Sequence, residues 1–171
     1  MPTAIETALI VLVSAAAWTD LRTKRIPNWI TVSGAAVGLG LHIVYGGASG
    51  AMQSLAGAAL GLAIFLGLYA AGGMGAGDVK LFGAVGAFAG PQALVLVFVL
   101  TGLLGGIAGV GLALYRGRLR QTLDRTRELF VGMGRMQWQQ VQATAGAPES
   151  LRLPYGAVIA GGTLLSLIVL R

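Results

Sequence analysis

The sequence contains no cysteine and only one histidine, His42, among its 171 residues. Without cysteine, the chain forms no disulfide, no CxxC zinc ribbon and no thiol nucleophile. A single histidine excludes HExxH and other metal sites that need several histidine ligands. Carboxylates therefore remain the best candidates for chemistry, and we expect no cofactor and no metal.

Charged residues are also scarce, at 11 % of the chain, whereas hydrophobic residues make up 56 % and the mean hydropathy is +0.79. A soluble domain is about 25 % charged and about 45–50 % apolar, so this composition indicates a membrane protein. No Lys or Arg precedes Arg22, and the first apolar run therefore lacks the basic segment of a cleaved signal peptide. We predict that this run is a retained helix.

The apolar runs predict one all-α domain over residues 1–171, a polytopic membrane bundle of about six transmembrane helices. The continuous apolar run 79–115 is too long for one crossing, and we expect it to break at Gly90-Pro91. The expected spans are residues 3–19, 29–45, 53–71, 79–90, 91–115 and 154–170. Several glycine pairs four residues apart, such as Gly57 and Gly61, would let these helices pack closely.

The net charge of +6 arises mainly from two basic segments, residues 20–28 and 116–152. Short cytoplasmic loops collect Lys and Arg, and anionic lipid headgroups attract them. We therefore expect the lipid bilayer, and not nucleic acid, to be the partner of these charges. In segment 116–152, apolar residues share one helical face, which predicts a basic amphipathic helix at the membrane surface; a solvated linker is the alternative.

An even number of expected spans separates the two basic segments, so both should lie on the cytoplasmic side. The same count places segment 72–78 on that side, so Asp20 and Asp78 should face one leaflet. Aromatic residues flank the basic segments as interfacial anchors would. They are Trp18, Trp29, Tyr115 and Tyr155.

Asp20 and Asp78 are two of only six acidic residues, and each borders a long apolar stretch. Acidic residues in or beside membrane spans are costly and are usually retained for a function. Two adjacent carboxylates share a proton, so the charged one can activate a water while the protonated one polarises a carbonyl. The glycine-rich segment 72–77 predicts that a helix starts near Asp78. In the simpler interpretation, Asp78 only caps that helix and Asp20 is an ordinary juxtamembrane charge.

Three segments carry a family resemblance, and they occur in the order Asp20 to Asn28, Gly75 to Lys80, and Leu153 to Gly156. The first reads Asp-Leu-Arg-Thr-Lys-Arg-Ile-Pro-Asn, the second Gly-Ala-Gly-Asp-Val-Lys and the third Leu-Pro-Tyr-Gly. Together they resemble the type IV prepilin peptidase family, the GxGD membrane aspartyl peptidases.

The resemblance implies that Asp20 and Asp78 are the catalytic pair of an aspartic endopeptidase. It also implies that prepilin-type precursors lose a short basic leader at the cytoplasmic face of the bacterial inner membrane. The supporting residues suggested by the matched motifs are Gly75, Gly77, Lys80, Arg22, Pro27 and Asn28. Lys80 and Arg22 could orient a carboxylate, hold headgroups or fix topology. Pro27 and Asn28 should shape the start of the second span.

Larger members of the family have paired cysteines in an added cytoplasmic region and also methylate the new pilin N-terminus. The present chain has no cysteine and is similar to the short forms of Flp-type, tight-adherence pilus systems. Methyltransferase activity is therefore not expected.

Other interpretations remain open at this point. The chain could be a transporter or channel subunit with Asp20 or Asp78 as a proton or cation site, or a non-catalytic scaffold. The segment Gly47-Ala48-Ser49-Gly50 matches the GxSG string of rhomboid serine peptidases, but His42 precedes the serine, against the rhomboid order. We expect His42 to be a hydrogen-bonded packing residue near the outer end of the second span.

Overall fold

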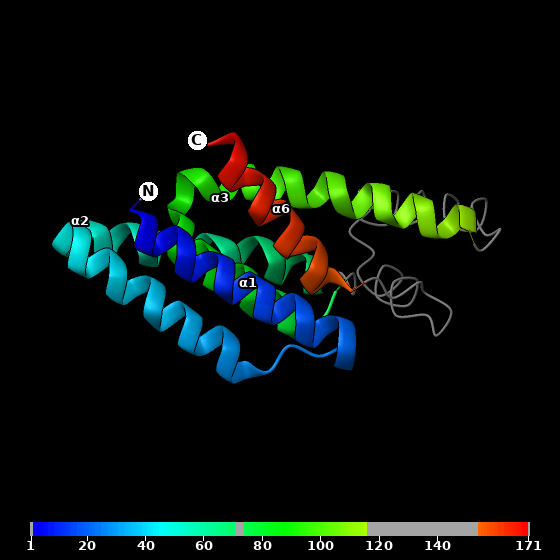
Figure 1. The fold of residues 1–171 in the computed structure, drawn as a ribbon, viewed down its shortest axis with the longest axis horizontal. Helices are drawn as coiled ribbons and strands as arrows, with labels where there is room; N and C mark the ends of the chain where they lie inside the picture. The colour runs from blue at the N-terminus through cyan, green and yellow to red at the C-terminus, as the bar shows by residue number, and fades with distance from the viewer. Residues whose placement is uncertain (1, 71–73, 116–153, 171) are drawn as a thin grey trace.

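The computed structural model describes residues 2–70, 74–115 and 154–170, which form helices and short connections without a strand. The helices are α1 (Thr3–Thr23), α2 (Asn28–Ala70), α3 (Ala76–Tyr115) and α6 (Tyr155–Val169). The prediction of an all-α bundle is therefore confirmed (Figure 1). Helices α1, α2 and α3 are each long and apolar enough to cross a membrane. The number of crossings, expected to be about six, stays a prediction, and segment 116–152 lies outside the described residues.

Both long helices bend once, each at a glycine with a positive φ. Gly47 in α2 has φ 56° and ψ −139°, and Gly90 in α3 has φ 71° and ψ 170°. Glycine adopts such angles readily because it has no Cβ. The break predicted at Gly90-Pro91 is confirmed, whereas the loop expected between residues 45 and 53 is reduced to the turn at Gly47. In Figure 1 the two bends lie at the end of the bundle where the chain termini are marked.

Side chains from α2 compensate for the backbone hydrogen bonds lost at the bend in α3. Pro91 has no N–H to donate to the carbonyl of Ala87, four residues earlier. The hydroxyl of Ser54 donates to that carbonyl instead, at 2.8 Å. His42 Nε2 lies 2.9 Å from the carbonyl oxygen of Phe88, the next residue. His42 is therefore the hydrogen-bonded packing residue that was expected.

The first half of α3 occupies the centre of the bundle. Its residues 81–90 are all buried, which fits a segment that is apolar on every side. Gly57 of α2 and Gly86 of α3 face each other so closely that a Cβ on either would meet the other's carbonyl oxygen. Phe65 and Phe82 stack beside them with ring centroids 3.9 Å apart. The glycine pairs thus serve contacts within the chain here.

The basic segment 20–28, expected to be a loop, begins instead as helix. Helix α1 continues past Thr19 to Thr23 and ends at Lys24, which has a left-handed φ of 51°. Leu21, Arg22 and Thr23 contain no helix breaker, and the chain turns only before Ile26-Pro27. Asp20 therefore lies inside the last turn of α1, and not in the connection that follows it.

Candidate active site

Asp20 is buried at the end of α1, with 7 % of its surface exposed. Its Oδ2 accepts a hydrogen bond of 2.8 Å from the backbone N–H of Gly156, at the start of α6. A buried carboxylate must be hydrogen-bonded, because the energetic penalty for leaving it unpaired is severe. The contact joins residues 136 positions apart in the sequence, so α6 closes the site against α1.

Asp78 is the third residue of α3 and is half-buried. Its Oδ2 accepts a hydrogen bond of 3.1 Å from the N–H of Gly75, the residue before the helix. The helix start predicted near Asp78 is confirmed. The carboxylate also acts as a cap, because it satisfies an N–H that the helix itself cannot use. This capping bond does not exclude a catalytic role for Asp78, because it uses Oδ2 and leaves Oδ1 out of the bond.

The structure brings Asp20 and Asp78 to one end of the bundle, near enough for the charge of one to act on the other. Ile26 contacts the starts of α3 and α6. A Cβ on Gly77 would lie 3.3 Å from the Ile26 Cβ, and a Cβ on Gly156 would lie 3.0 Å from the Ile26 Cδ1. Ile26 thus packs against the residues that adjoin both carboxylates. The expectation that the two aspartates share one side of the protein agrees with this packing.

The supporting residues of the second motif take distinct places around Asp78. Gly75 leaves space for the carboxylate, because a Cβ there would lie 3.3 Å from Asp78 Oδ2. Gly77 leaves space for Ile26, as described above. Lys80 donates a hydrogen bond of 3.0 Å from Nζ to Asn28 Oδ1. This exposed bond links the start of α3 to the start of α2.

The supporting residues of the first motif are divided between the two ends of the α1–α2 connection. Pro27 precedes α2, and its carbonyl accepts the N–H of Ile30, so Asn28 is the first residue of α2 and not its cap. The guanidinium of Arg22 stacks over the ring of Trp18, 4.2 Å from the ring centroid. That contact holds Arg22 on the exposed surface of α1, against the aromatic ring.

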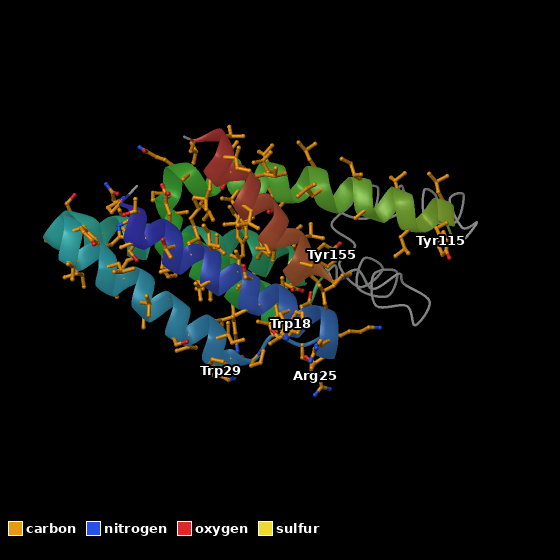
Figure 2. All side chains as sticks on the ribbon, in the orientation of Figure 1. Trp18, Arg25, Trp29, Tyr115 and Tyr155 are labelled. Carbon is orange, nitrogen blue, oxygen red and sulfur yellow. The ribbon has the colours of Figure 1, made fainter. Side chains whose placement is uncertain are left out.

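The labelled aromatic residues lie toward the same end of the bundle as the α1–α2 connection (Figure 2). Trp18 and Trp29 are exposed and belong to the helices on either side of that connection, Arg22 stacks over Trp18, and Tyr155 lies at the start of α6. Exposed tryptophan beside arginine is typical of residues at a membrane–water interface.

From the sequence, Ile26 and Gly156 belong only to matched motifs and Tyr155 is expected to be an interfacial anchor, whereas the structure places all three beside the aspartates. Tyr155 is close enough to Asp78 for the charge of the carboxylate to act on its phenol. Gly156 lies two residues after Pro154, in the first turn of α6, where glycine does not favour a helix. A glycine at such a position was the only sequence signal that another group lies close to the backbone there.

Among the described residues, no group of three or more His, Cys, Asp or Glu is arranged to hold a metal ion.

Residues 7–110, which include both aspartates, match the family model described as the type IV leader peptidase family. The chain belongs to this family. It is 36 % identical over 104 residues to the prepilin leader peptidase/N-methyltransferase of Aeromonas hydrophila, covering 57 % of this chain and 36 % of that protein. It is 54 % identical over 44 residues to the protein of the same name from Aeromonas salmonicida, covering 26 % of this chain and 15 % of that protein.

The chain therefore spans about a third or less of the length of these relatives. No solved structure matches it.

Proposed function

We propose that this leader peptidase family member is an aspartic endopeptidase that removes the leader of prepilin-type precursors. The observation that carries the proposal is the convergence of Asp20 and Asp78, each hydrogen-bonded to a backbone N–H and each within electrostatic reach of the other. The names of the Aeromonas relatives support prepilins as the substrate class. The methyltransferase named with them is not part of the proposal.

The chemistry requires one proton shared by the two aspartates, so that one is a carboxylate and the other a carboxylic acid. The carboxylate takes a proton from water, whose oxygen attacks the scissile carbonyl carbon while the carboxylic acid gives its proton to the carbonyl oxygen. One hydroxyl of the resulting tetrahedral intermediate gives a proton to the aspartate that began as the carboxylic acid, which restores that acid. The C–N bond then breaks, and the leaving amine takes the proton that the other aspartate had removed from water.

We place the reaction at the cytoplasmic face of the bacterial inner membrane. The support is the position of the exposed residues Lys24 and Arg25 directly after the last turn of α1, the turn that contains Asp20. Basic residues beside membrane helices are retained on the cytoplasmic side. A precursor with its leader in the cytoplasm and its apolar segment in the bilayer would present the scissile bond at this level.

The proposal is tested by coexpression of the chain with candidate prepilin-type precursors, with leader removal measured as a mass shift. Asp20→Asn and Asp78→Asn should each reduce cleavage at least about 100-fold, because an amide can neither take nor give the required proton. Glu6→Gln is the matched control: it removes a carboxylate from the opposite end of α1 and should leave cleavage unchanged. All variants are first checked for membrane insertion.

Cleavage that persists in either asparagine variant would refute the assignment of the pair. A proton or cation flux that both variants lose, without any precursor cleavage by the unaltered protein, would favour a transporter.

A further inference from the structure

The start of α6 forms one wall of the site, although the chemistry above assigns it no part. Pro154 occupies the cap position and Tyr155 is the first helical residue, so Gly156 is in the first turn of α6. The first N–H groups of a helix have no partner within the helix. The N–H of Gly156 donates to the buried Oδ2 of Asp20 at 2.8 Å, and this is the direct contact between α6 and the carboxylate.

The absence of a side chain at Gly156 is what permits that bond. A Cβ at this position would lie 2.9 Å from Asp20 Oδ2 and 3.0 Å from Asp20 Cβ. It would also lie 3.0 Å from the Ile26 Cδ1, on the other side. A methyl group could not fit without moving either the carboxylate or the start of α6, and both movements lengthen the hydrogen bond.

We propose that Gly156 is a positioning residue for Asp20. Its N–H fixes the direction of the carboxylate, and its lack of a side chain lets α6 approach close enough to make that bond. Gly156 does not touch the substrate and acts only through Asp20. The inference rests on the proposed peptidase function for its catalytic consequence, but the contact itself can be tested without any substrate.

Helix α6 carries two further glycines that serve as matched controls. A Cβ on Gly161 would meet only Leu104 Cδ1, at 3.1 Å, and this is the end of a flexible side chain. A Cβ on Gly162 would meet the backbone nitrogen of Thr101 at 2.7 Å, so alanine there should disturb the packing of α6 on α3. The same substitution therefore has three different expected effects on one helix.

The experiment measures kcat, KM and Tm in detergent for the three glycine-to-alanine variants. Gly156→Ala should lower kcat by about 10- to 100-fold, because misplacement of a catalytic group by about 1 Å has effects of this size. Its KM should stay within about twofold, because the substrate contacts are not changed. Gly161→Ala should leave kcat, KM and Tm unchanged. Gly162→Ala should lower Tm and reduce the amount of folded enzyme, with a kcat per folded molecule near that of the unaltered protein.

A second measurement tests the contact independently of activity. Gly156→Ala should lower Tm in the unaltered chain, and it should lower Tm by less when Asp20 has been replaced by alanine, because the clash with Oδ2 is then absent. An equal loss of Tm in both backgrounds would overturn the inference, since Gly156 would then act through Ile26 or through α6 alone. An unchanged kcat in Gly156→Ala would overturn it as well. If the unaltered protein cleaves no precursor, the proposed function fails, and the Tm comparison still decides whether Gly156 positions Asp20.

Discussion

The closest backbone contact between α2 and α3 predicts a large effect of adding one methyl group at Gly57. A Cβ there would lie 2.1 Å from the carbonyl oxygen of Gly86 and 2.8 Å from the Cα of Gly90. Both are backbone atoms of the buried first half of α3, so no side chain can rotate away. To reach an ordinary van der Waals distance, α2 and α3 must separate by about 1 Å, and a gap of that size forfeits about a quarter to a half of each dispersion contact.

Overpacking of a well-packed core costs about 1–3 kcal/mol, and we expect Gly57→Ala to reach the upper end because only backbone can yield. For a domain of this size, a loss of about 3 kcal/mol lowers Tm by about 6–12 °C. The matched control is Gly67→Ala, on the same helix, because a Cβ on Gly67 has nothing within 4 Å. There alanine should be neutral or should stabilise α2 by up to about 1 kcal/mol through its higher helix propensity.

The assay is thermal unfolding in detergent, followed by the loss of the helical circular dichroism signal. Gly86→Ala should behave as Gly57→Ala does, because a Cβ on Gly86 would lie 2.2 Å from the carbonyl oxygen of Gly57. The reasoning would be refuted if Gly57→Ala melted within about 2 °C of the unaltered protein. It would also be refuted if Gly67→Ala lost as much stability as Gly57→Ala, since the effect would then not depend on the contact.

Two other contacts give predictions that thermal unfolding can check. Ser54→Ala removes the donor to the buried carbonyl of Ala87 and should cost about 1–3 kcal/mol, whereas Ser33→Ala, whose hydroxyl bonds within its own helix on an exposed face, should be nearly neutral. A similar Tm for the two variants would contradict the role given to Ser54. Lys80→Met should cost less than about 1 kcal/mol because its bond to Asn28 is exposed, and adding Asn28→Ala should cause no further loss. A double variant whose loss equals the sum of the single losses would show that the bond contributes nothing.

The helices and one of the two bends could be predicted because each follows from local chemistry. Long apolar runs predict membrane helices, and Gly90-Pro91 combines a residue that tolerates positive φ with one that lacks an N–H. The turn at Gly47 was expected to be a loop of several residues. The turn is tight enough that Gly50, after it, lies against the backbone of His42, before it. A Cβ on Gly50 would collide with the His42 carbonyl oxygen. Local sequence does not reveal this close contact across the turn.

The end of α1 shows how charge patterning can mislead. Arg22, Lys24 and Arg25 suggested that the polar segment after Thr19 was a loop, but charged residues continue a helix well when no breaker intervenes. The extra turn is important because it places Asp20 inside a helix that packs against α6. The sequence thus predicted the pair of aspartates and their shared side, whereas the contact of one of them with Gly156 is visible only in the structure.

Both carboxylates of the site accept their described hydrogen bonds from backbone N–H groups, and the composition of the chain helps to explain this. The chain has no cysteine, and its single histidine is engaged at the bend in α3, so neither can serve a buried carboxylate at the opposite end of the bundle. The unused donors in a helical membrane protein are the first N–H groups of each helix. Asp20 takes one from Gly156 and Asp78 takes one from Gly75, and in both cases the donor is a glycine.

The hydrogen bonds from helix starts to the two aspartates link the sequence motifs to the topology. A carboxylate that depends on a helix start can be held only where such a start is present, so the starts of α3 and α6 must lie at the end of the bundle where α1 finishes. A side chain at either donor would crowd the carboxylate, because a Cβ would lie 3.3 Å from Asp78 Oδ2 at Gly75 and 2.9 Å from Asp20 Oδ2 at Gly156. Gly75 and Gly156 therefore share one physical role, because each brings a backbone N–H within hydrogen-bonding distance of one aspartate, whereas Gly77 makes room for Ile26.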